Sequence, residues 1–189
     1  MRSDSEAACM LNLPNSLSLL RILTAPVLIV LLISPGVYLS VISAVIFAVI
    51  CVTDWLDGYI ARKRGAVTPL GKFLDPLADK ILITTAFIML IPLGRVPAWV
   101  VALIISREIA VTGLRAVASN MGVVMQASRL GKFKTLAQIV AITPLLVHHT
   151  IFGINFHLLG TALLVAAFIL TIWSGIDYFM NFFKTSSSS

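Results

Sequence analysis

The stretch from Asp54 to Asp79 constrains this chain most, because it places four aspartates within 26 residues between long apolar segments. At a helical rotation of about 100° per residue, Asp54 and Asp57 lie about 60° apart on one helix face. Asp75 and Asp79 lie about 40° apart on another. Carboxylates that converge in a low-dielectric setting repel one another unless cations or protons intervene. Because oxygen ligands suit hard divalent ions, the pattern indicates a two-metal site for Mg²⁺ or Mn²⁺.

The composition is that of an integral membrane protein. The 189 residues are 59% hydrophobic and only 12% charged, with a mean hydropathy of +1.01, whereas soluble domains carry about 25% charged residues. At about 20 residues per span, this length accommodates six transmembrane helices and little else. The net charge of +6 fits anionic lipids and phosphate-bearing substrates. No nucleic-acid-binding motif accompanies it, so nucleic acid is excluded as a partner.

Proline, glycine and polar residues divide the apolar sequence into six predicted helices. Asn15 or Ser16 is predicted to cap the first helix, and Thr68 with Pro69 to begin the third. The predicted helices span residues of about 15–33, 38–62, 68–90, 98–118, 130–147 and 155–179.

We therefore expect an all-α membrane protein with one compact domain of six transmembrane helices over residues 15–183. Residues 1–14 are predicted to form a cytoplasmic or interfacial segment, and the serine-rich residues 184–189 a disordered tail. The first apolar run begins too late for a cleaved signal peptide. Cys9 and Cys51 differ too much in their surroundings for a disulfide framework, so both are predicted to be free thiols.

Lysine and arginine predict the topology. Segments 62–72 and 115–134 carry four of them each, while the turns near residues 34, 95 and 150 contain only Arg95. The two basic segments and both termini should therefore face the cytoplasm. The acidic motif and the second basic segment then lie on the same side of the membrane.

Several polar residues within or beside the predicted helices leave alternatives open. Arg21 either snorkels to the interface or faces the acidic site. Asn15 and Ser18 are weak candidates for substrate contact, and helix capping or surface exposure is favoured for both. His148 and His149 fall on the side opposite the acidic motif, where an interfacial or loop position is favoured over metal binding.

The aspartates belong to a longer pattern of eight fixed positions, DxxDGxxAR followed after eight residues by GxxxDxxxD. This pattern resembles the signature of the CDP-alcohol phosphotransferase family. The resemblance implies a magnesium- or manganese-dependent enzyme in which an alcohol displaces CMP from a CDP-lipid. It also implies that Asp54, Asp57 and Asp75 hold two metal ions. Asp79 would contact the second ion and accept the proton of the alcohol.

Small residues accompany both acidic faces. Gly58 and Ala61 on one predicted helix and Gly71 on the next leave room for a flat pyrimidine near the backbone, although tight helix packing explains them as well. The family resemblance implies that Gly58, Arg62 and Thr68 bind CDP-diacylglycerol. The guanidinium of Arg62 suits charge-assisted bonds to the diphosphate.

The segment 107–135 resembles the bacterial phosphatidylglycerophosphate synthases within this family, which implies sn-glycerol 3-phosphate as the acceptor. Arg107 and Arg115 are eight residues apart, so on one helix they lie about 80° apart and two turns along. We expect Arg107, Arg115 and Lys132 to hold the acceptor phosphate. Arg129 and Lys134 are instead expected to snorkel to lipid headgroups.

Inositol phosphate is the second candidate acceptor, since it offers the same phosphate, and serine or choline is less favoured because neither needs a cationic cluster. A divalent-ion transporter would also place carboxylates within helices, but it would not explain the interleaved Gly, Ala and Arg. A lipid-binding protein would explain the apolar segments alone. The resemblance further implies a homodimer in the bacterial inner membrane, where it serves phospholipid biosynthesis with its active site facing the cytoplasm.

Overall fold

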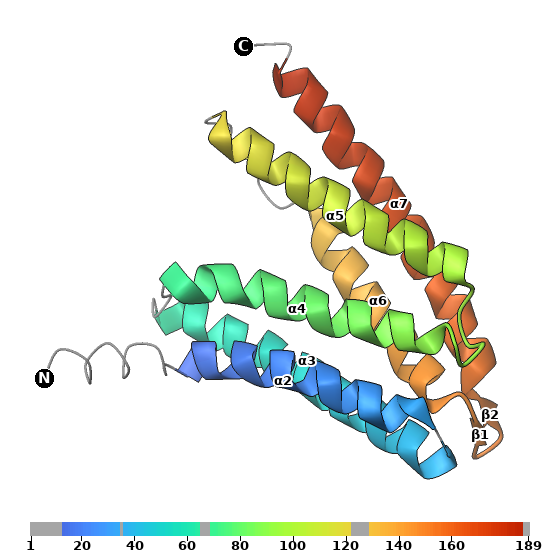
Figure 1. The fold of residues 1–189 in the computed structure, drawn as a ribbon. Helices are drawn as coiled ribbons and strands as arrows, with labels where there is room; N and C mark the ends of the chain where they lie inside the picture. Colours follow the sequence, from blue (N-terminus) through green and yellow to red (C-terminus); the bar gives the residue numbers. More distant parts are fainter. Residues whose placement is uncertain (1–12, 35, 65–68, 122–128, 187–189) are drawn as a thin grey trace, which may run out of the picture. The chain divides into compact units, whose positions relative to one another are not determined.

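The computed structural model describes residues 13–34, 36–64, 69–121 and 129–186. These residues form six helices and one β-hairpin (Figure 1). Two compact units divide the chain, Met1–Met89 and Leu90–Ser189. The elements are α2 (Leu13–Ile33), α3 (Val37–Arg64), α4 (Pro69–Leu90), α5 (Ala98–Asn120), α6 (Arg129–Val147), β1 (Thr150–Ile151), β2 (Ile154–Asn155) and α7 (Phe156–Ser186).

Each predicted helix overlaps one observed helix, and α3 to α7 start within one residue of their predicted positions. The breaks lie where proline and glycine predict them. Pro69 is the first residue of α4, and Pro97 precedes α5 in an extended conformation. Gly94, between these helices, has a left-handed φ of 66°, which glycine adopts without steric cost.

Three local predictions are wrong. Asn15 and Ser16 lie within α2 rather than at its cap, because Pro14 is tolerated in the first helical turn. Ser18 is fully buried rather than exposed. Helix α7 continues to Ser186, because no glycine or proline follows residue 175 to end it. The predicted tail is therefore helical over residues 184–186.

The β-hairpin between α6 and α7 was not predicted. Thr150 pairs with Asn155 and Ile151 with Ile154. Phe152 and Gly153 form the turn with φ values of 51° and 78°, and two left-handed residues in succession match the twist of a two-residue hairpin. The side chain of Asn155 then accepts a hydrogen bond from the N–H of Leu158 at 3.0 Å, which caps the start of α7.

In the first unit, α2 packs against α3. Leu28 and Leu32 of α2 and Phe47 of α3 are fully buried. The hydroxyl groups of Thr24 and Ser43 donate to the carbonyl oxygens of Leu20 and Leu39, four residues earlier, at 2.7 Å. Such bonds within a helix satisfy hydroxyl groups that water does not reach.

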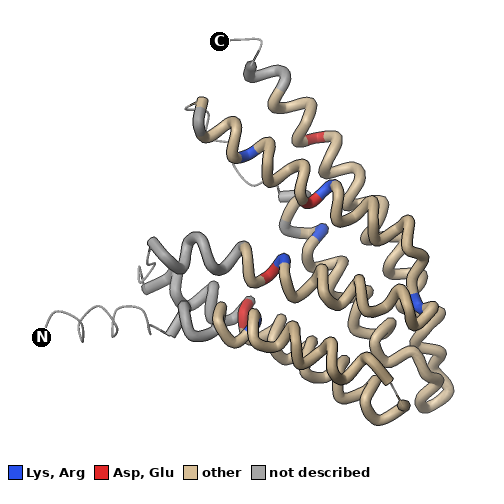
Figure 2. The backbone as a smooth tube through the Cα atoms, viewed as in Figure 1, with Lys and Arg blue, Asp and Glu red and all other residues tan. Residues whose placement is uncertain are grey.

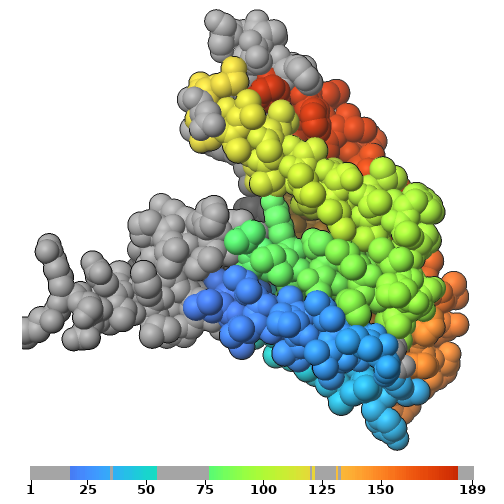
Figure 3. Space-filling model, viewed as in Figure 1, coloured from blue at the N-terminus to red at the C-terminus, as the bar shows by residue number. Residues whose placement is uncertain are grey.

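In the second unit, α7 packs against both α6 and α5, and the space-filling view shows the atoms of α5 and α7 in one continuous surface (Figure 3). A Cβ atom on Gly160 of α7 would lie only 2.7 Å from the Cγ of Leu145 and 2.9 Å from its backbone nitrogen. Glycine therefore allows α6 and α7 to approach closely. Buried Arg95 donates from Nη1 to the carbonyl oxygens of Leu145 at 3.2 Å and Leu146 at 2.5 Å, which satisfies the end of α6.

Charged residues are sparse along the described helices (Figure 2), and many apolar side chains face outward, among them Val30 (69% exposed) and Trp173 (67% exposed). Within the described residues, two segments are long and apolar enough to cross a membrane, Val37–Asp54 and Phe156–Phe182. Two shorter apolar helical segments, Ser18–Ile33 and Phe133–Val147, accompany them. The six transmembrane spans and the single domain over residues 15–183 stay predictions.

Candidate functional site

The first group of predicted site residues lies at the end of α3 and the start of α4. Asp54 and Asp57 belong to α3, and Asp75 and Asp79 to α4. The structure describes the side chains of Asp54 and Asp79 only. Both carboxylates act electrostatically on the thiol of Cys51, one turn before Asp54. Asp54 of α3 and Asp79 of α4 therefore both lie near Cys51, and the grouping of all four aspartates stays a prediction.

Arg21 belongs to this acidic group. Its Nη2 forms an ion pair with Oδ1 of Asp54. The arginine side chain is 4% exposed and the carboxylate 35%, so the cation lies beneath the carboxylate and not at a lipid interface. Of the two alternatives for Arg21, snorkelling to the interface is therefore wrong, and a position facing the acidic group is confirmed. A buried guanidinium at this position offsets part of the charge repulsion among neighbouring carboxylates.

The donor atoms of the acidic group decide whether it suits a metal ion. Of the four predicted ligands, only two have described side chains, and among described side chains no group of three or more His, Cys, Asp or Glu lies close enough to hold an ion. Asp54 nevertheless takes a cationic partner and remains one-third exposed. Carboxylate oxygens are the donors that Mg²⁺ and Mn²⁺ prefer, so the residues fit such an ion.

The predicted contacts to CDP-diacylglycerol fall on the same two helices. Gly58, Ala61 and Arg62 lie in the last two turns of α3, and Gly71 in the first turn of α4. Their surroundings lie outside the described side chains, and Thr68 lies outside the described residues. These assignments stay predictions.

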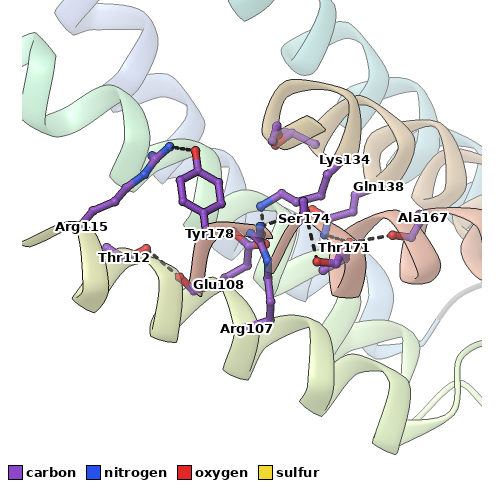
Figure 4. A network of polar contacts seen from close by, with 12 residues as sticks. Arg107, Glu108, Thr112, Arg115, Lys134, Gln138, Ala167, Thr171, Ser174 and Tyr178 are labelled. Atoms are coloured by element: carbon purple, nitrogen blue, oxygen red, sulfur yellow. Dashed lines mark hydrogen bonds and ion pairs between the residues drawn. The ribbon is translucent and has the colours of Figure 1, made fainter. Parts of the chain in front are cut away.

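The second group, which we call the cationic cluster, lies between α5, α6 and α7 (Figure 4). Arg107 donates from Nη2 to the hydroxyl of Ser174 at 2.9 Å. Arg115 donates to the hydroxyl of Tyr178. The guanidinium carbons of Arg115 and Arg107 lie 4.8 Å and 5.9 Å from the centre of the Tyr178 ring. The members of the cluster are Arg107, Glu108, Arg115, Lys134, Ser174 and Tyr178.

The two arginines therefore reach one place, which is the geometry predicted from their spacing. The ring of Tyr178 lies within cation–π range of both guanidinium groups. Tyr178 is buried, and the electron-rich face of its ring lies near the guanidinium group of Arg107 and that of the solvent-exposed Arg115. A site of this kind suits a phosphate group, which arginine binds with paired hydrogen bonds.

The prediction for Lys134 is wrong. Its ammonium forms an ion pair with Glu108 of α5 and is only 8% exposed, so it does not snorkel to lipid headgroups. The reason is tertiary, since Glu108 offers a half-buried carboxylate that compensates the buried charge. The side chains of Lys132 and Arg129 lie outside the described part of the structure, so their roles stay predictions.

Helix α7 supports the cluster through small and polar residues. A Cβ atom on Gly175 would lie 3.0 Å from Cγ and 3.2 Å from Nε of Arg107, so the absent side chain makes room for the arginine. Ser174 donates to the carbonyl oxygen of Thr171 at 3.1 Å. The hydroxyl of Thr171 in turn accepts from Nε2 of Gln138 on α6 at 3.1 Å. The bond between Gln138 and Thr171 thus joins α6 to α7 beside the cations.

Sequence reasoning missed Glu108, Lys134, Ser174 and Tyr178 as members of the site. One signal was present, because Thr171, Ser174 and Tyr178 recur at intervals of three and four residues in a mostly apolar segment. Such spacing places polar groups on one helix face. The partners of that face were not visible in the sequence.

The histidines lie at the other end of α6. Nδ1 of His148 lies 3.1 Å from Nδ1 of His157, and their rings are 4.6 Å apart. His148 has a left-handed φ of 62°, directly after α6 ends. The favoured loop position is confirmed for His148, and His157 is a partner that the sequence did not indicate.

Comparison with known proteins identifies the family of this chain. Residues 11–173 match the CDP-alcohol phosphatidyltransferase family. A Bacillus subtilis protein named CDP-diacylglycerol–glycerol-3-phosphate 3-phosphatidyltransferase is 42% identical over 193 aligned residues, covering 95% of this chain and all of that protein. A Mycobacterium tuberculosis protein named probable phosphatidylglycerophosphate synthase is 42% identical, covering 88% of this chain and 79% of its own. A Rickettsia typhi protein with the same name as the Bacillus protein is 39% identical, over 90% and 96%.

Proposed function

Because the chain belongs to the CDP-alcohol phosphatidyltransferase family, we propose that it moves the phosphatidyl group of CDP-diacylglycerol to sn-glycerol 3-phosphate. The products are phosphatidylglycerophosphate and CMP, and the reaction serves phospholipid biosynthesis. The names of its relatives support this donor and this acceptor. The observation that carries the acceptor is the cationic cluster, in which Arg107 and Arg115 converge on Tyr178.

The cluster favours an acceptor that carries a phosphate monoester. Arg107 and Lys134 contact the carboxylate of Glu108, and Arg115 contacts the phenol of Tyr178. A dianionic phosphate would meet several charge-assisted donors there, which fixes one end of the acceptor. Serine and choline carry no phosphate group, so neither acceptor would use the positive charges of this cluster. Lys132 stays a proposed fourth contact.

At the acidic group, Asp54, Asp57 and Asp75 would hold two divalent ions, Mg²⁺ or Mn²⁺. Bound there, these ions would supply neutralisation of charge on the diphosphate. Asp79 would accept the proton of the acceptor hydroxyl as its oxygen bonds to the phosphorus that carries diacylglycerol. The bond from that phosphorus to the bridging oxygen breaks, and the electron pair leaves with CMP.

The donor would lie along the small residues of α3 and α4. Gly58, Ala61 and Gly71 leave space for the cytosine ring close to the backbone. Arg62 would bind the diphosphate, and Thr68 would contribute a further polar contact. The reaction needs two substrates, a lipid-linked diphosphate and a soluble phosphate monoester. The acidic group would serve the first, and the cationic cluster the second.

The apolar helices and the family make this chain a membrane protein. We place it in the bacterial inner membrane as a homodimer among lipids, with six spans, both termini and the active site on the cytoplasmic side.

Labelling of single cysteines at positions 65 and 120 tests the topology. Both should react from the cytoplasmic side, and labelling from opposite sides would contradict this topology. In nanodiscs at working concentration, a monomeric protein would contradict the dimer.

An acceptor competition with radiolabelled CDP-diacylglycerol tests the function. Purified protein with Mg²⁺ should release CMP when sn-glycerol 3-phosphate is added, and the lipid product should be phosphatidylglycerophosphate. Faster CMP release with inositol 1-phosphate or with serine than with sn-glycerol 3-phosphate would change the proposed acceptor but not the proposed reaction. Metal-dependent ion flux in vesicles without CMP release would instead identify a transporter.

A further inference from the structure

A single carboxylate organises two cations of the cationic cluster. Oε1 of Glu108 accepts a hydrogen bond from Nη1 of Arg107 at 3.0 Å and one from Nζ of Lys134. The arginine lies beside Glu108 on α5, whereas the lysine comes from α6. Because both donors share one oxygen atom, the guanidinium and the ammonium lie within about 6 Å of each other.

Without an anion between them, these two cations would not keep that spacing. The side chains of Arg107 and Lys134 are each 8% exposed, and that of Glu108 is 18% exposed. Like charges repel more strongly where water does not screen them, so the lysine would move away or lose its proton. Glu108 therefore determines where two of the three cations of the cluster lie.

The carboxylate also sets the charge of the cluster. Arg107, Arg115 and Lys134 contribute three positive charges and Glu108 one negative charge, so the described members carry a net charge of +2. A phosphate monoester above its second pKa of about 6 carries two negative charges. The cluster and such a ligand would neutralise each other.

We propose that Glu108 is a positioning residue for the acceptor, which holds Arg107 and Lys134 in the arrangement that orients the phosphate and thereby its reacting hydroxyl. This inference rests on the proposed function, because it assumes a phosphorylated acceptor in the cluster. It adds a division of labour, in which the cations determine how tightly the phosphate binds and Glu108 determines in which orientation it binds. Misplacement of a bound reactant lowers turnover more than affinity.

The test is steady-state kinetics of Glu108→Gln in detergent micelles that contain CDP-diacylglycerol and Mg²⁺. Glutamine keeps the length of the side chain and removes the charge. We expect kcat to fall about tenfold or more, and by a larger factor than the acceptor KM rises, while the KM for CDP-diacylglycerol changes less than about threefold. Glu108→Asp keeps the charge and should recover part of kcat. Thr112→Ala is the control, because the exposed hydroxyl of Thr112 donates to the backbone carbonyl of Glu108 and not to its carboxylate, and it should behave as wild type.

An unchanged kcat in Glu108→Gln, or a higher acceptor KM with an unchanged kcat, would overturn the inference. If Glu108→Gln does not fold, the double variant Glu108→Met with Lys134→Met replaces the ion pair by apolar side chains of similar length. The inference then predicts a folded protein with low kcat, and wild-type kcat would overturn it. All variants are measured with the phosphorylated acceptor that wild type prefers. If wild type prefers inositol 1-phosphate to glycerol 3-phosphate, the proposed function is refuted, and the kinetics of Glu108→Gln with inositol 1-phosphate still test the role of Glu108.

Discussion

The acidic group of α3 and α4 and the cationic cluster of α5, α6 and α7 are built in different ways. The four aspartates occupy two short helical repeats that are close in sequence, between residues 54 and 79. The cationic cluster draws on residues between Arg107 and Tyr178, from three helices. A local pattern therefore specifies the first group, whereas packing specifies the second.

Each group contains one residue of the opposite charge, Arg21 in the acidic group and Glu108 in the cationic cluster. The carboxylates in these ion pairs differ in exposure. Arg21 lies buried under Asp54, whose side chain is 35% exposed, while Glu108 in the cationic cluster is 18% exposed. The acidic group thus keeps an accessible carboxylate for a mobile cation. In the cationic cluster, the ionic partners are held by fixed contacts within the protein. We expect the first group to respond to loss of metal and the second to changes in packing.

The largest effect should come from the acidic group. Asp79→Asn is expected to lower kcat by about 10²- to 10⁴-fold, because the acceptor hydroxyl loses its base, while binding of CDP-diacylglycerol is largely kept. Asp57→Asn should instead raise the concentration of Mg²⁺ needed for half-maximal activity. CMP release and a lipid-binding assay separate the two effects. A wild-type kcat in Asp79→Asn would show that Asp79 is not the general base.

In the cationic cluster, Arg115→Ala should raise the KM for glycerol 3-phosphate about 10- to 100-fold, since hydrogen bonds from a charged donor contribute about 1.5–3 kcal/mol. Lys134→Ala should have an effect of the same kind, and Lys132→Ala in parallel tests the lysine predicted from the sequence. Acceptor titrations at saturating CDP-diacylglycerol provide the KM values. An unchanged KM in both Arg115→Ala and Lys134→Ala would show that the phosphate binds elsewhere.

A smaller change tests whether packing controls the cluster. Gly175→Ala introduces a methyl group 3.0 Å from Cγ and 3.2 Å from Nε of Arg107, so the arginine must shift by a few tenths of an ångström. We expect the acceptor KM to rise a few-fold, about threefold, with Mg²⁺ dependence unchanged. Gly113→Ala is the control, because a Cβ atom there has no neighbour within 4 Å. Equal KM values in the two variants would show that the cluster tolerates displacement.

The smallest expected effect concerns His148, at the other end of α6 from the cationic cluster. Burial, followed by the nearby charges of Arg95, His157 and His149, lowers the pKa of His148 below its ordinary value of 6.5. The unfolded chain then binds more protons in acid, so the free energy of unfolding should decrease as pH falls below about 6.5. Thermal unfolding between pH 7.5 and 5 measures this decrease.

His148→Asn is the matched variant, because asparagine tolerates the left-handed φ of 62° at this position and does not titrate. Its unfolding temperature should depend less on pH than that of wild type. An identical pH dependence would assign the effect to other groups. CMP release at pH 7.5 should not differ from wild type, since His148 belongs to neither the acidic group nor the cationic cluster.

Much of the fold could be predicted because its signals are local. Six apolar segments separated by proline and glycine predict six helices, and five of them start within one residue of the predicted position. The β-hairpin escaped prediction, because its turn residues, Phe152 and Gly153, stand within a mostly apolar stretch and carry only one glycine as a signal. The start of α2 escaped it because Pro14 is compatible both with a first helical turn and with a break.

By itself, the sequence determined the helices and the membrane character, and it predicts two acidic faces, because helical periodicity converts spacing directly into direction. The spacing of Arg107 and Arg115 also placed them on neighbouring faces of one helix. Only the tertiary structure decided that Arg21 pairs with Asp54 and that Lys134 is buried on Glu108. A long, flexible cationic side chain reaches lipid, water or a carboxylate with similar ease. Which of these it meets depends on the helix packed against it.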